Sequence, residues 1–357
     1  MRKKANTIKE RRRIHLVGIK GAGMSALAVN LKQMGHAVTG SDHAEMFFTE
    51  RLLAKHGLKA LTPFAAKNIP LDTELVIAST AYRTDNNSEL AEAKRRGLPI
   101  LTYPQMLGQL TSQLPSIAVC GSHGKTTTAA IISWVASRSA WHPMVNVGSI
   151  IPQLLDYRAQ RPKLFIFEAD EYQNKFQYFH PWLIVLTNID YDHPDYFKDE
   201  AHYLQTFRDF IKRVPTRGQL IYCLDDKNAS SVAQRLPKNK RISYGFSPGA
   251  DYQIKLAGMD SAGMEWSVYR RGRRWSWFHS KLIGEHNARN LTAAVICARL
   301  LKITLQTTRV RLADFLGTAR RLEVKKAFLL HGHKVLIVDD YGHHPTEIRA
   351  TLNALKT

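Results

Sequence analysis

The stretch SIAVCGSHGKTTT, residues 116–128, joins a short apolar run directly to a glycine turn, a lysine and three hydroxyl side chains. An apolar run of this length is typical of a buried strand, and we expect Lys125 to open a helix. A glycine turn before a helix presents backbone N–H groups and a lysine to phosphate oxygens, and a hydroxyl to Mg²⁺. The stretch therefore predicts a loop that binds a nucleoside triphosphate.

The spacing of this loop, G-x-x-G-K-T, is shorter than the general pattern, so an ordinary glycine-rich turn is the alternative. Around it, apolar runs alternate with helical stretches in the rhythm of a parallel sheet covered by helices. Strands are expected at 14–19, 37–40, 74–79, 98–101, 116–121, 163–168, 182–187 and 219–224, and a β-rich stretch at 251–283. Helices are expected near 24–34, 47–56, 87–96, 104–111 and 200–214, from Lys125, from Asn287, and near 306–316.

A length of 357 residues corresponds to two or three domains of an α/β protein. We expect a basic tail (1–13), a Rossmann-like N-terminal domain (14–112), a central P-loop ATPase-type α/β domain (113–321) and the truncated start of a third α/β domain (322–357). In the last segment we expect a strand at 334–340 and a helix after Pro345. One strand and one helix cannot form a core alone, so this segment is expected to be incomplete, as a fragment or a natural truncation.

Composition excludes several classes of protein. No run of about 18 apolar residues occurs, so no membrane span is expected. The three cysteines are far apart and lack metal-site spacing, which indicates a reducing cytoplasm and no structural zinc. The formal net charge of +21 would attract nucleic acid, acidic membranes and polyanionic metabolites alike.

Basic residues concentrate in two patches. One lies in the tail, at residues 2–4 and 11–13, and the other holds four arginines at 270–274 among tryptophans and a tyrosine. The second patch resembles a nucleic-acid-binding surface. Its alternation of basic and aromatic residues also fits an exposed hairpin whose aromatic side chains face the core. We favour the hairpin, and binding of nucleic acid is not expected.

A second glycine loop, GIKGAGMS at 18–25, follows an apolar run and opens a helix, and Ser41 and Asp42 end the next strand. This arrangement holds a pyrophosphate at a helix N-terminus, with a polar group reaching the sugar. The loop is not a full G-x-G-x-x-G, so NAD binding is not established. Glycines that serve only a tight turn are the alternative.

Acidic and polar residues follow two strands downstream of the phosphate loop. EADE at 168–171 ends one strand, and TNIDYDHPD at 187–195 follows the next. A carboxylate at such a strand end can complete a Mg²⁺ shell begun by the Thr126 hydroxyl, because Mg²⁺ prefers oxygen ligands. A polar loop is the alternative for each segment alone.

Taken together, seven motifs resemble the Mur ligase family, in the family's order and over nearly the whole chain. They are GIKGAGMS (18–25), GSHGKTTT (121–128), EADEY (168–172), TNIDYDHPDYF (187–197), GEHNARN (284–290), GTARR (317–321) and DDYGHHPTEI (339–348). The short spacing of the phosphate loop is normal for this family. Within it, the chain is most similar to the enzymes that join L-alanine to UDP-N-acetylmuramate.

The resemblance implies where the substrates bind. The residues expected at the UDP-sugar are Gly21, Ala22, Gly23, Met24, Ser25, Asp42, Ser79 and Thr80. The residues expected at ATP are Gly121, Ser122, His123, Gly124, Lys125, Thr126, Thr127, Asn287, Asn290 and Arg321. Asn amides carry both a donor and an acceptor for an adenine edge, and helix capping by Asn287 is the alternative.

The resemblance also implies a metal and a catalytic set. Thr126 and Glu168 would hold one Mg²⁺, and His193 a second. Asp340, Tyr341, His343 and His344 would lie near the sugar-borne carboxylate and the amino acid. The expected catalytic residues are Lys125, Glu168, His193 and His344, and no residue stands out as the base for the amine, with Asp192, His344 and water as candidates.

The implied reaction transfers the γ-phosphoryl group of ATP to a carboxylate, and an amine then attacks the acyl phosphate. Three other readings stay open. A related ligase adds a recycled peptide to the same UDP-sugar, a non-catalytic protein binds nucleotide, UDP-sugar or nucleic acid, and an oxidoreductase binds NAD at the first glycine loop. The sequence does not determine whether the chain is active without a full third domain, nor its oligomeric state.

Overall fold

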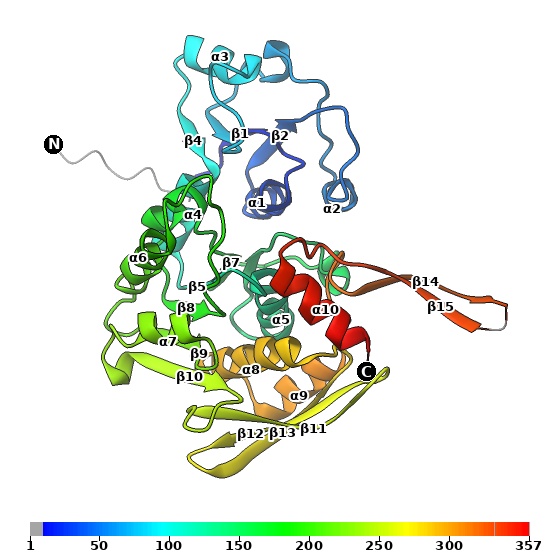
Figure 1. The fold of residues 1–357 in the computed structure, drawn as a ribbon. Helices are drawn as coiled ribbons and strands as arrows, with labels where there is room; N and C mark the ends of the chain where they lie inside the picture. Colours follow the sequence, from blue (N-terminus) through cyan, green and yellow to red (C-terminus); the bar gives the residue numbers. More distant parts are fainter. Residues whose placement is uncertain (1–9, 332, 357) are drawn as a thin grey trace.

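The computed structural model describes residues 10–331 and 333–356 (Figure 1). Arg2, Lys3 and Lys4 of the expected basic tail lie outside the described residues, and only residues 10–13 of that tail are described. The structure has two parallel α/β units and a short C-terminal segment. It thus confirms the expected fold class of a Rossmann-like unit followed by a P-loop unit.

The first unit is a four-stranded parallel sheet in the order β2-β1-β3-β4. Its strands are β1 (Arg13–Val17), β2 (Ala37–Ser41), β3 (Leu75–Ala78) and β4 (Ile100–Thr102). Its helices are α1 (Ala22–Gln33), α2 (Glu50–Lys55), α3 (Ser88–Arg95) and α4 (Tyr103–Gln113). The carboxyl end of β1 leads into the first glycine loop, which places that loop at the ligand-facing edge of the sheet.

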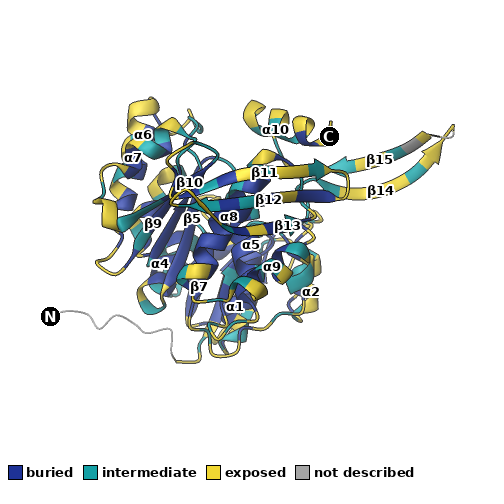
Figure 2. Cartoon of the chain, turned by 90° about the horizontal axis from the view of Figure 1, so that it is seen from below, coloured by how far each residue is buried: buried dark blue, intermediate teal, exposed yellow. Residues whose placement is uncertain are grey.

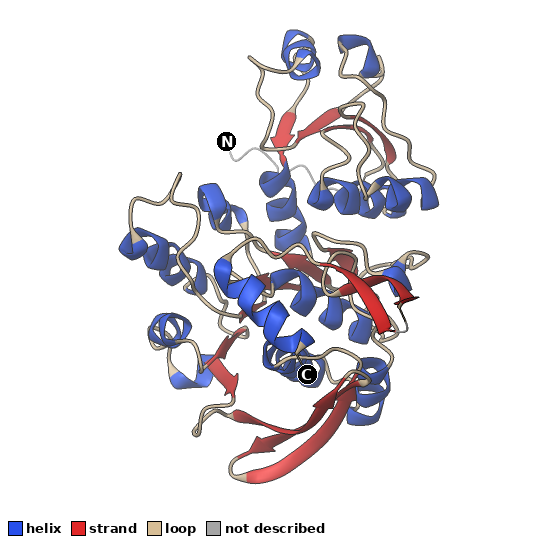
Figure 3. Ribbon diagram, turned by 45° about the vertical axis from the view of Figure 1, so that its right-hand side comes forward, coloured by secondary structure: helices blue, strands red, loops and turns tan. Residues whose placement is uncertain are grey.

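The second unit is a nine-stranded sheet in the order β13-β12-β11-β10-β9-β8-β5-β7-β6. Its strands are β5 (Ser116–Cys120), β6 (Met144–Asn146), β7 (Phe165–Glu168), β8 (Leu183–Leu186), β9 (Gln219–Cys223), β10 (Arg241–Gly245), β11 (Tyr252–Asp260), β12 (Gly263–Arg270) and β13 (Arg273–Ser280). Its helices are α5 (Lys125–Ala136), α6 (Glu200–Ile211), α7 (Lys227–Ala233), α8 (Glu285–Leu300) and α9 (Leu305–Ala313). The strands from β6 to β11 run parallel, and β11, β12 and β13 form an antiparallel edge, seen at the bottom of Figure 3.

Strand β5 lies between β7 and β8 among the parallel strands and is buried on both faces. Ala118 and Cys120 belong to the core that contains α6, whereas Ile117 and Val119 belong to the core that contains α5 and α8. This alternation follows from the two-residue period of a strand. The phosphate loop therefore starts from a rigid strand between two cores.

The C-terminal segment differs from the expectation of one strand and one helix. It contains a hairpin of two antiparallel strands, β14 (Glu323–Leu330) and β15 (His333–Asp339), followed by helix α10 (Pro345–Leu355). Figure 2 shows the hairpin extending away from the rest of the molecule, largely exposed. The sequence of β14, EVKKAFLL, does not alternate apolar and polar residues, so the pattern did not predict this strand.

Other local expectations also change. Helix α8 begins at Glu285 after Gly284, so Asn287 is its third residue and not its cap. Strands β6 and β10 and helix α7 were not expected. The arginine-rich stretch is a hairpin of β12 and β13, as favoured, with Trp266 buried, but Trp277 is 49% exposed and lies under the guanidinium of Arg309. Among the helices that the structure describes, none has the length and apolar character needed to cross a bilayer.

Candidate active site

The phosphate loop connects β5 to α5 through two glycines with positive φ angles. Gly121 has φ 122° and Gly124 has φ 78°, a conformation that favours glycine. A Cβ on Gly124 would lie 2.8 Å from Oδ1 of Asn290, so helix α8 packs directly against the loop. The loop opens helix α5, whose first N–H groups and dipole favour an anion.

The segment after β8 supports the phosphate loop. Asn188 accepts a hydrogen bond from the backbone N–H of His123 through Oδ1 at 2.9 Å and donates one to its carbonyl through Nδ2 at 2.9 Å. Thr187 donates a hydrogen bond to the same carbonyl at 2.6 Å. The T-N-I-D segment therefore fixes the loop backbone, a role that its sequence did not reveal.

The side chain of Lys125 contacts the backbone of the phosphate loop. Its Nζ donates to the carbonyls of Gly121 at 2.5 Å and Ser122 at 3.1 Å and forms an ion pair with Glu171 at 3.4 Å. Burial lowers the pKa of Lys125, but the carboxylates of Glu171, Asp170 and Glu168 raise it more, so the net pKa is above its ordinary value. The ammonium group is thus held charged, as binding of phosphate requires.

Glu171 is a buried residue that the sequence analysis did not single out. Tyr203 donates a hydrogen bond to its Oε1 at 3.0 Å, and the hydroxyls of Tyr203 and Ser122 lie 2.9 Å apart. A buried carboxylate needs such partners, because an unpaired one costs several kcal/mol. The second glutamate of EADE was the available signal, but Lys125 and Tyr203, which face it, are far away in sequence.

Glu168 and Thr126 lie together at the ends of β7 and the phosphate loop. The Thr126 hydroxyl donates to Oε2 of Glu168 at 3.0 Å, and the Gly148 N–H donates to Oε1 at 2.5 Å. Burial raises the pKa of Glu168 above its ordinary value despite these hydrogen bonds. A hydroxyl and a carboxylate are hard oxygen donors, so this pair fits Mg²⁺, whose charge would favour the ionised carboxylate.

His193 lies beside a different pair of carboxylates. One potential ligand atom from each of His193, Asp170 and Glu171 lies within 4.8 Å of the others. The His193 ring packs on that of Tyr172, with centroids 4.7 Å apart, and its φ is 58°. Of the expected metal residues, the structure thus pairs Thr126 with Glu168 and places His193 in a neighbouring group.

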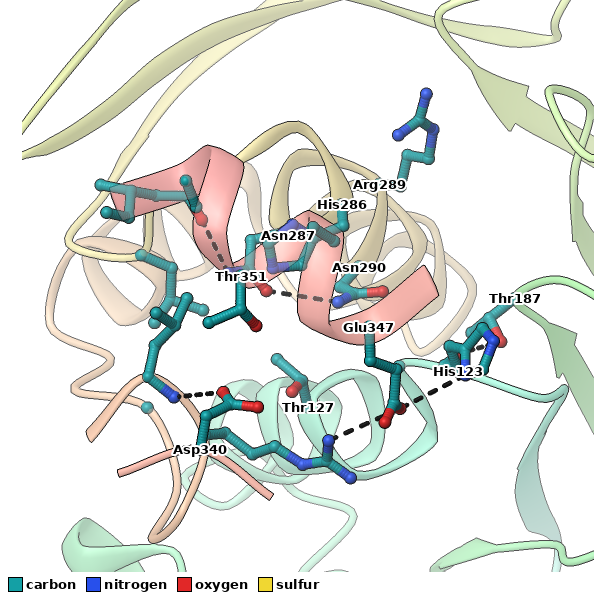
Figure 4. A pocket seen from close by; sticks show the side chains of 18 of the residues that line it. His123, Thr127, Thr187, His286, Asn287, Arg289, Asn290, Asp340, Glu347 and Thr351 are labelled. Atoms are coloured by element: carbon teal, nitrogen blue, oxygen red, sulfur yellow. Dashed lines mark hydrogen bonds and ion pairs between the residues drawn. The ribbon is translucent and has the colours of Figure 1, made fainter. Parts of the chain in front are cut away.

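A cavity of about 1120 Å³ opens beside the phosphate loop (Figure 4). Of the residues expected at ATP, it is lined by His123, Gly124, Thr127, Asn287, Asn290 and Arg321. Asn290 donates a hydrogen bond to Oδ1 of Asn287 at 3.3 Å, and Asn287 donates to the carbonyl of Ile283 at 2.8 Å. The cavity is continuous with the phosphate loop and has room for a nucleoside.

Glu347 of α10 lines this cavity between His123 and Arg321, and sequence reasoning assigned it no role. Its Oε1 lies 3.3 Å from Nδ1 of His123 and 3.6 Å from Arg321, and Figure 4 shows it directed toward His123. Burial raises the pKa of Glu347, but His123 and Arg321 outweigh it and lower the pKa to about 2. The expected triphosphate residues therefore hold a carboxylate of the C-terminal segment in this structure.

The four C-terminal residues expected near the amino acid occupy different positions. Asp340 lines the cavity and accepts hydrogen bonds from the N–H groups of Leu322 and Gly342. His344 packs against His123, with ring centroids 4.7 Å apart. Tyr341 lies under the guanidinium groups of Arg320 and Arg321, and His343 is mostly exposed.

The first glycine loop is held by Asp42. Its two carboxylate oxygens accept from the backbone N–H groups of Lys20 at 2.7 Å and His43 at 2.8 Å, and Asp42 is buried. Asp42 therefore shapes the loop, whereas sequence reasoning placed it near the sugar. Gly21 precedes α1 and residues 22–25 form its start. A Cβ on Gly18 would lie 2.9 Å from Ser79 Cβ, so Ser79 adjoins the same loop, and Thr80 follows it in sequence.

A chain of contacts joins this loop to the metal pair. Asn146 of β6 accepts a hydrogen bond from the Tyr103 hydroxyl at 2.7 Å and donates one to the carbonyl of Gly23 at 3.2 Å. Two residues later, Gly148 donates to Glu168. The expected UDP-sugar residues and Glu168 thus lie at one boundary between the two sheets.

Comparisons with known proteins agree with this arrangement. Residues 13–114 match the model described as Mur ligase family, catalytic domain, and residues 119–298 match the model described as Mur ligase middle domain. The chain is 39% identical over 360 residues to a UDP-N-acetylmuramate–L-alanine ligase of Treponema pallidum (strain Nichols), covering 97% of this chain and 73% of the relative. It is 38% identical over 342 residues to the same-named ligase of Streptococcus gordonii, covering 96% and 73%.

Solved structures share the fold. The crystal structure of a UDP-N-acetylmuramate-alanine ligase from Thermotoga maritima superposes with a TM-score of 0.83 at 26% identity, covering 97% of this chain and 78% of that one. A ligase from Neisseria meningitides that adds L-alanyl-gamma-D-glutamyl-meso-diaminopimelate to UDP-N-acetylmuramate superposes with a TM-score of 0.70 at 22% identity, covering 86% and 98%. The likeness to the Neisseria meningitides structure shows a shared fold only.

Proposed function

The chain belongs to the Mur ligase family, and from that premise we propose that it joins L-alanine to the lactyl carboxylate of UDP-N-acetylmuramate with conversion of ATP to ADP and phosphate, a step in the synthesis of peptidoglycan precursors. The observation that carries the proposal is the path from the first glycine loop through Asn146 and Gly148 to Glu168, beside Lys125. This path joins residues expected at the UDP-sugar to Glu168, which accepts a hydrogen bond from Thr126 of the loop expected at the triphosphate. The identity of the amino acid rests on the ligases of 38–39% identity.

In the first half-reaction, a carboxylate oxygen of the sugar attacks the γ-phosphorus of ATP, the bond to the β-phosphate oxygen breaks, and ADP leaves. Lys125 stabilises negative charge on the transferred group, and the N-terminus of α5 contributes its N–H groups. Asn287 and Asn290 are proposed to contact the adenine, and Arg321 the triphosphate. Thr126 and Glu168 would hold one Mg²⁺ and His193 a second, and Mg²⁺ neutralises phosphate charge when bound.

In the second half-reaction, the neutral amine of L-alanine attacks the acyl carbon, the amine loses a proton, and phosphate leaves. Holding the two substrates in reach of each other supplies much of the rate, because it replaces an encounter in solution. Asp340, Tyr341, His343 and His344 are proposed to lie on the amino-acid side. A cytoplasmic location fits an enzyme that uses ATP and has three buried free cysteines.

The test is product formation by this 357-residue chain. ADP and the alanyl product should form only when ATP, UDP-N-acetylmuramate, L-alanine and Mg²⁺ are all present, as measured by mass spectrometry. Replacing L-alanine by L-alanyl-gamma-D-glutamyl-meso-diaminopimelate distinguishes the proposed alanine ligase from the alternative, a peptide ligase. Preference for the peptide, or binding of ATP and sugar with no turnover, would overturn the proposal.

A further inference from the structure

Two imidazoles and one carboxylate converge where three distant segments meet. His123 comes from the phosphate loop, Asp190 from the segment after β8, and His344 from the residue before α10. Nε2 of His123 lies 3.2 Å from Oδ2 of Asp190, and Nδ1 of His344 lies 3.6 Å from the same oxygen. One potential ligand atom from each of the three lies within 4.8 Å of the others.

We propose that His123, Asp190 and His344 form a binding site for a divalent ion of the zinc class, distinct from the Mg²⁺ pair Thr126 and Glu168. Zinc commonly takes imidazole nitrogen and carboxylate oxygen from three protein side chains and keeps a fourth position for water. Bonds of about 2.0–2.1 Å in a tetrahedral shell place neighbouring ligand atoms roughly 3.3 Å apart. The distances from His123 and His344 to Asp190 are close to that spacing, and the two imidazole nitrogens, which lie within 4.8 Å of each other, would move together on binding.

The surroundings orient these ligands as metal sites require. A metal-binding histidine usually gives its second ring nitrogen to a carboxylate, and Nδ1 of His123 lies 3.3 Å from Oε1 of Glu347. The Thr346 hydroxyl donates to Oδ2 of Asp190 at 2.8 Å, which fixes the ligating carboxylate. Nδ1 of His344 accepts a long hydrogen bond of 3.3 Å from the Thr346 N–H, and the ion would replace it.

The ligand chemistry selects the class of ion. Two imidazoles favour Zn²⁺ or Co²⁺ over Mg²⁺, which prefers oxygen ligands and octahedral geometry. The side chain of His123 is 13% exposed, that of His344 24% and that of Asp190 41%, so an ion can enter from solvent. Because the ligands come from both the phosphate loop and the C-terminal segment, a bound ion would hold helix α10 against the loop.

The proposal is tested by titrating the metal-free full chain with Co²⁺, with saturating Mg²⁺ and no nucleotide or sugar present. Tightly bound Co²⁺ should give the visible absorption of a four-coordinate ion, at one equivalent. His344→Ala and Asp190→Asn should each weaken binding by at least about tenfold, and Glu347→Gln by about tenfold. Circular dichroism of each variant establishes that it is folded.

Two histidine variants serve as matched controls. His343→Ala removes the adjacent, mostly exposed histidine and should leave the Co²⁺ affinity unchanged. His193→Ala removes the histidine beside Asp170 and Glu171 and should also leave it unchanged. Equal affinity in wild type and in folded His344→Ala, or loss of the Co²⁺ signal in His193→Ala, would overturn the proposal. The readout needs no ligase activity, so it fails or succeeds independently of the proposed function.

Discussion

At the scale of single residues, the Lys125–Glu171 pair shows how one contact serves stability and chemistry together. The ammonium is held by two loop carbonyls and by a carboxylate that is fully buried. The carboxylate in turn depends on Lys125 and Tyr203. Removing the lysine therefore affects the fold as well as the reaction, and the two effects have to be separated.

Lys125→Met should lower ligase turnover by at least about 100-fold and unfolding free energy by about 3 kcal/mol, because it removes a transition-state charge and leaves the buried Glu171 without its cationic partner. The double variant Lys125→Met/Glu171→Gln should recover most of the stability and none of the activity. Urea unfolding and ADP release measure the two properties. If Lys125→Met is as stable as wild type, the predicted role of Lys125 in stability is wrong. If the double variant is active, the predicted role of Lys125 in the reaction is wrong.

A second buried carboxylate, Glu89, makes the first unit sensitive to acid. Its Oε2 lies 3.3 Å from Nε2 of His15, and its Oε1 accepts hydrogen bonds from Asn68 at 2.9 Å and the Ala65 N–H at 3.1 Å. Burial raises the pKa of Glu89, but its hydrogen bonds outweigh burial and bring the pKa below its ordinary value of 4.5. The unfolded chain then binds the proton more tightly than the folded one.

The stability that Glu89 contributes should be present above pH 4.5 and lost as pH falls through the lower folded pKa. Glu89→Gln should be less stable than wild type at pH 7, and the difference should shrink on acidification below pH 4.5. Urea midpoints at a series of pH values measure this. Asp72→Asn, at an exposed carboxylate of the same unit, should follow the wild-type curve, and parallel curves for Glu89→Gln and wild type would refute the prediction.

At the scale of elements, the start of α5 depends on a glycine for two separate reasons. Gly124 has a positive φ, and it also faces Asn290 of α8 with no room for a Cβ. Gly97, after α3, has a positive φ of 66° but nothing within 4 Å of an added Cβ. The two positions thus separate backbone strain from close packing.

Gly97→Ala should cost about 1 kcal/mol of unfolding free energy and leave ATP affinity unchanged, because only the left-handed backbone is penalised. Gly124→Ala should cost more and weaken ATP binding by at least about tenfold, because the methyl group displaces Asn290 from the phosphate loop. Urea unfolding and calorimetric ATP titration measure both. Equal effects of the two variants would mean that the α5–α8 contact does not shape the loop.

At the scale of the whole molecule, helix α1 connects the two sheets. The Asn30 amide donates to the carbonyl of Val145 at 2.8 Å, and the Gln33 amide donates to the carbonyl of Tyr157 at 3.1 Å. The same helix begins at the first glycine loop, so the contact that joins the units also positions that loop over β6. The relative placement of the two sites therefore depends on a few polar contacts along one helix.

Asn30→Ala should raise hydrogen exchange at residues 144–148 about fivefold, since it removes one hydrogen bond worth about 1 kcal/mol between α1 and β6. Exchange in β5 should stay unchanged, because both of its faces are buried in the second unit. Lys32→Ala, on the exposed side of α1, is the matched control. Unchanged exchange at 144–148 would show that Asn30 does not hold the units together.

The sequence by itself determined the α/β fold class, the family and most helices and strands, because apolar period, glycine turns and short motifs are local properties of the chain. It was wrong about the single strand before α10, and it assigned no role to Glu171 or Glu347. Only the tertiary structure decided which side chains meet. The order β8-β5-β7 brings together the ends of strands far apart in sequence, and α10 then adds Glu347 and His344 beside His123, contacts that no local pattern encodes.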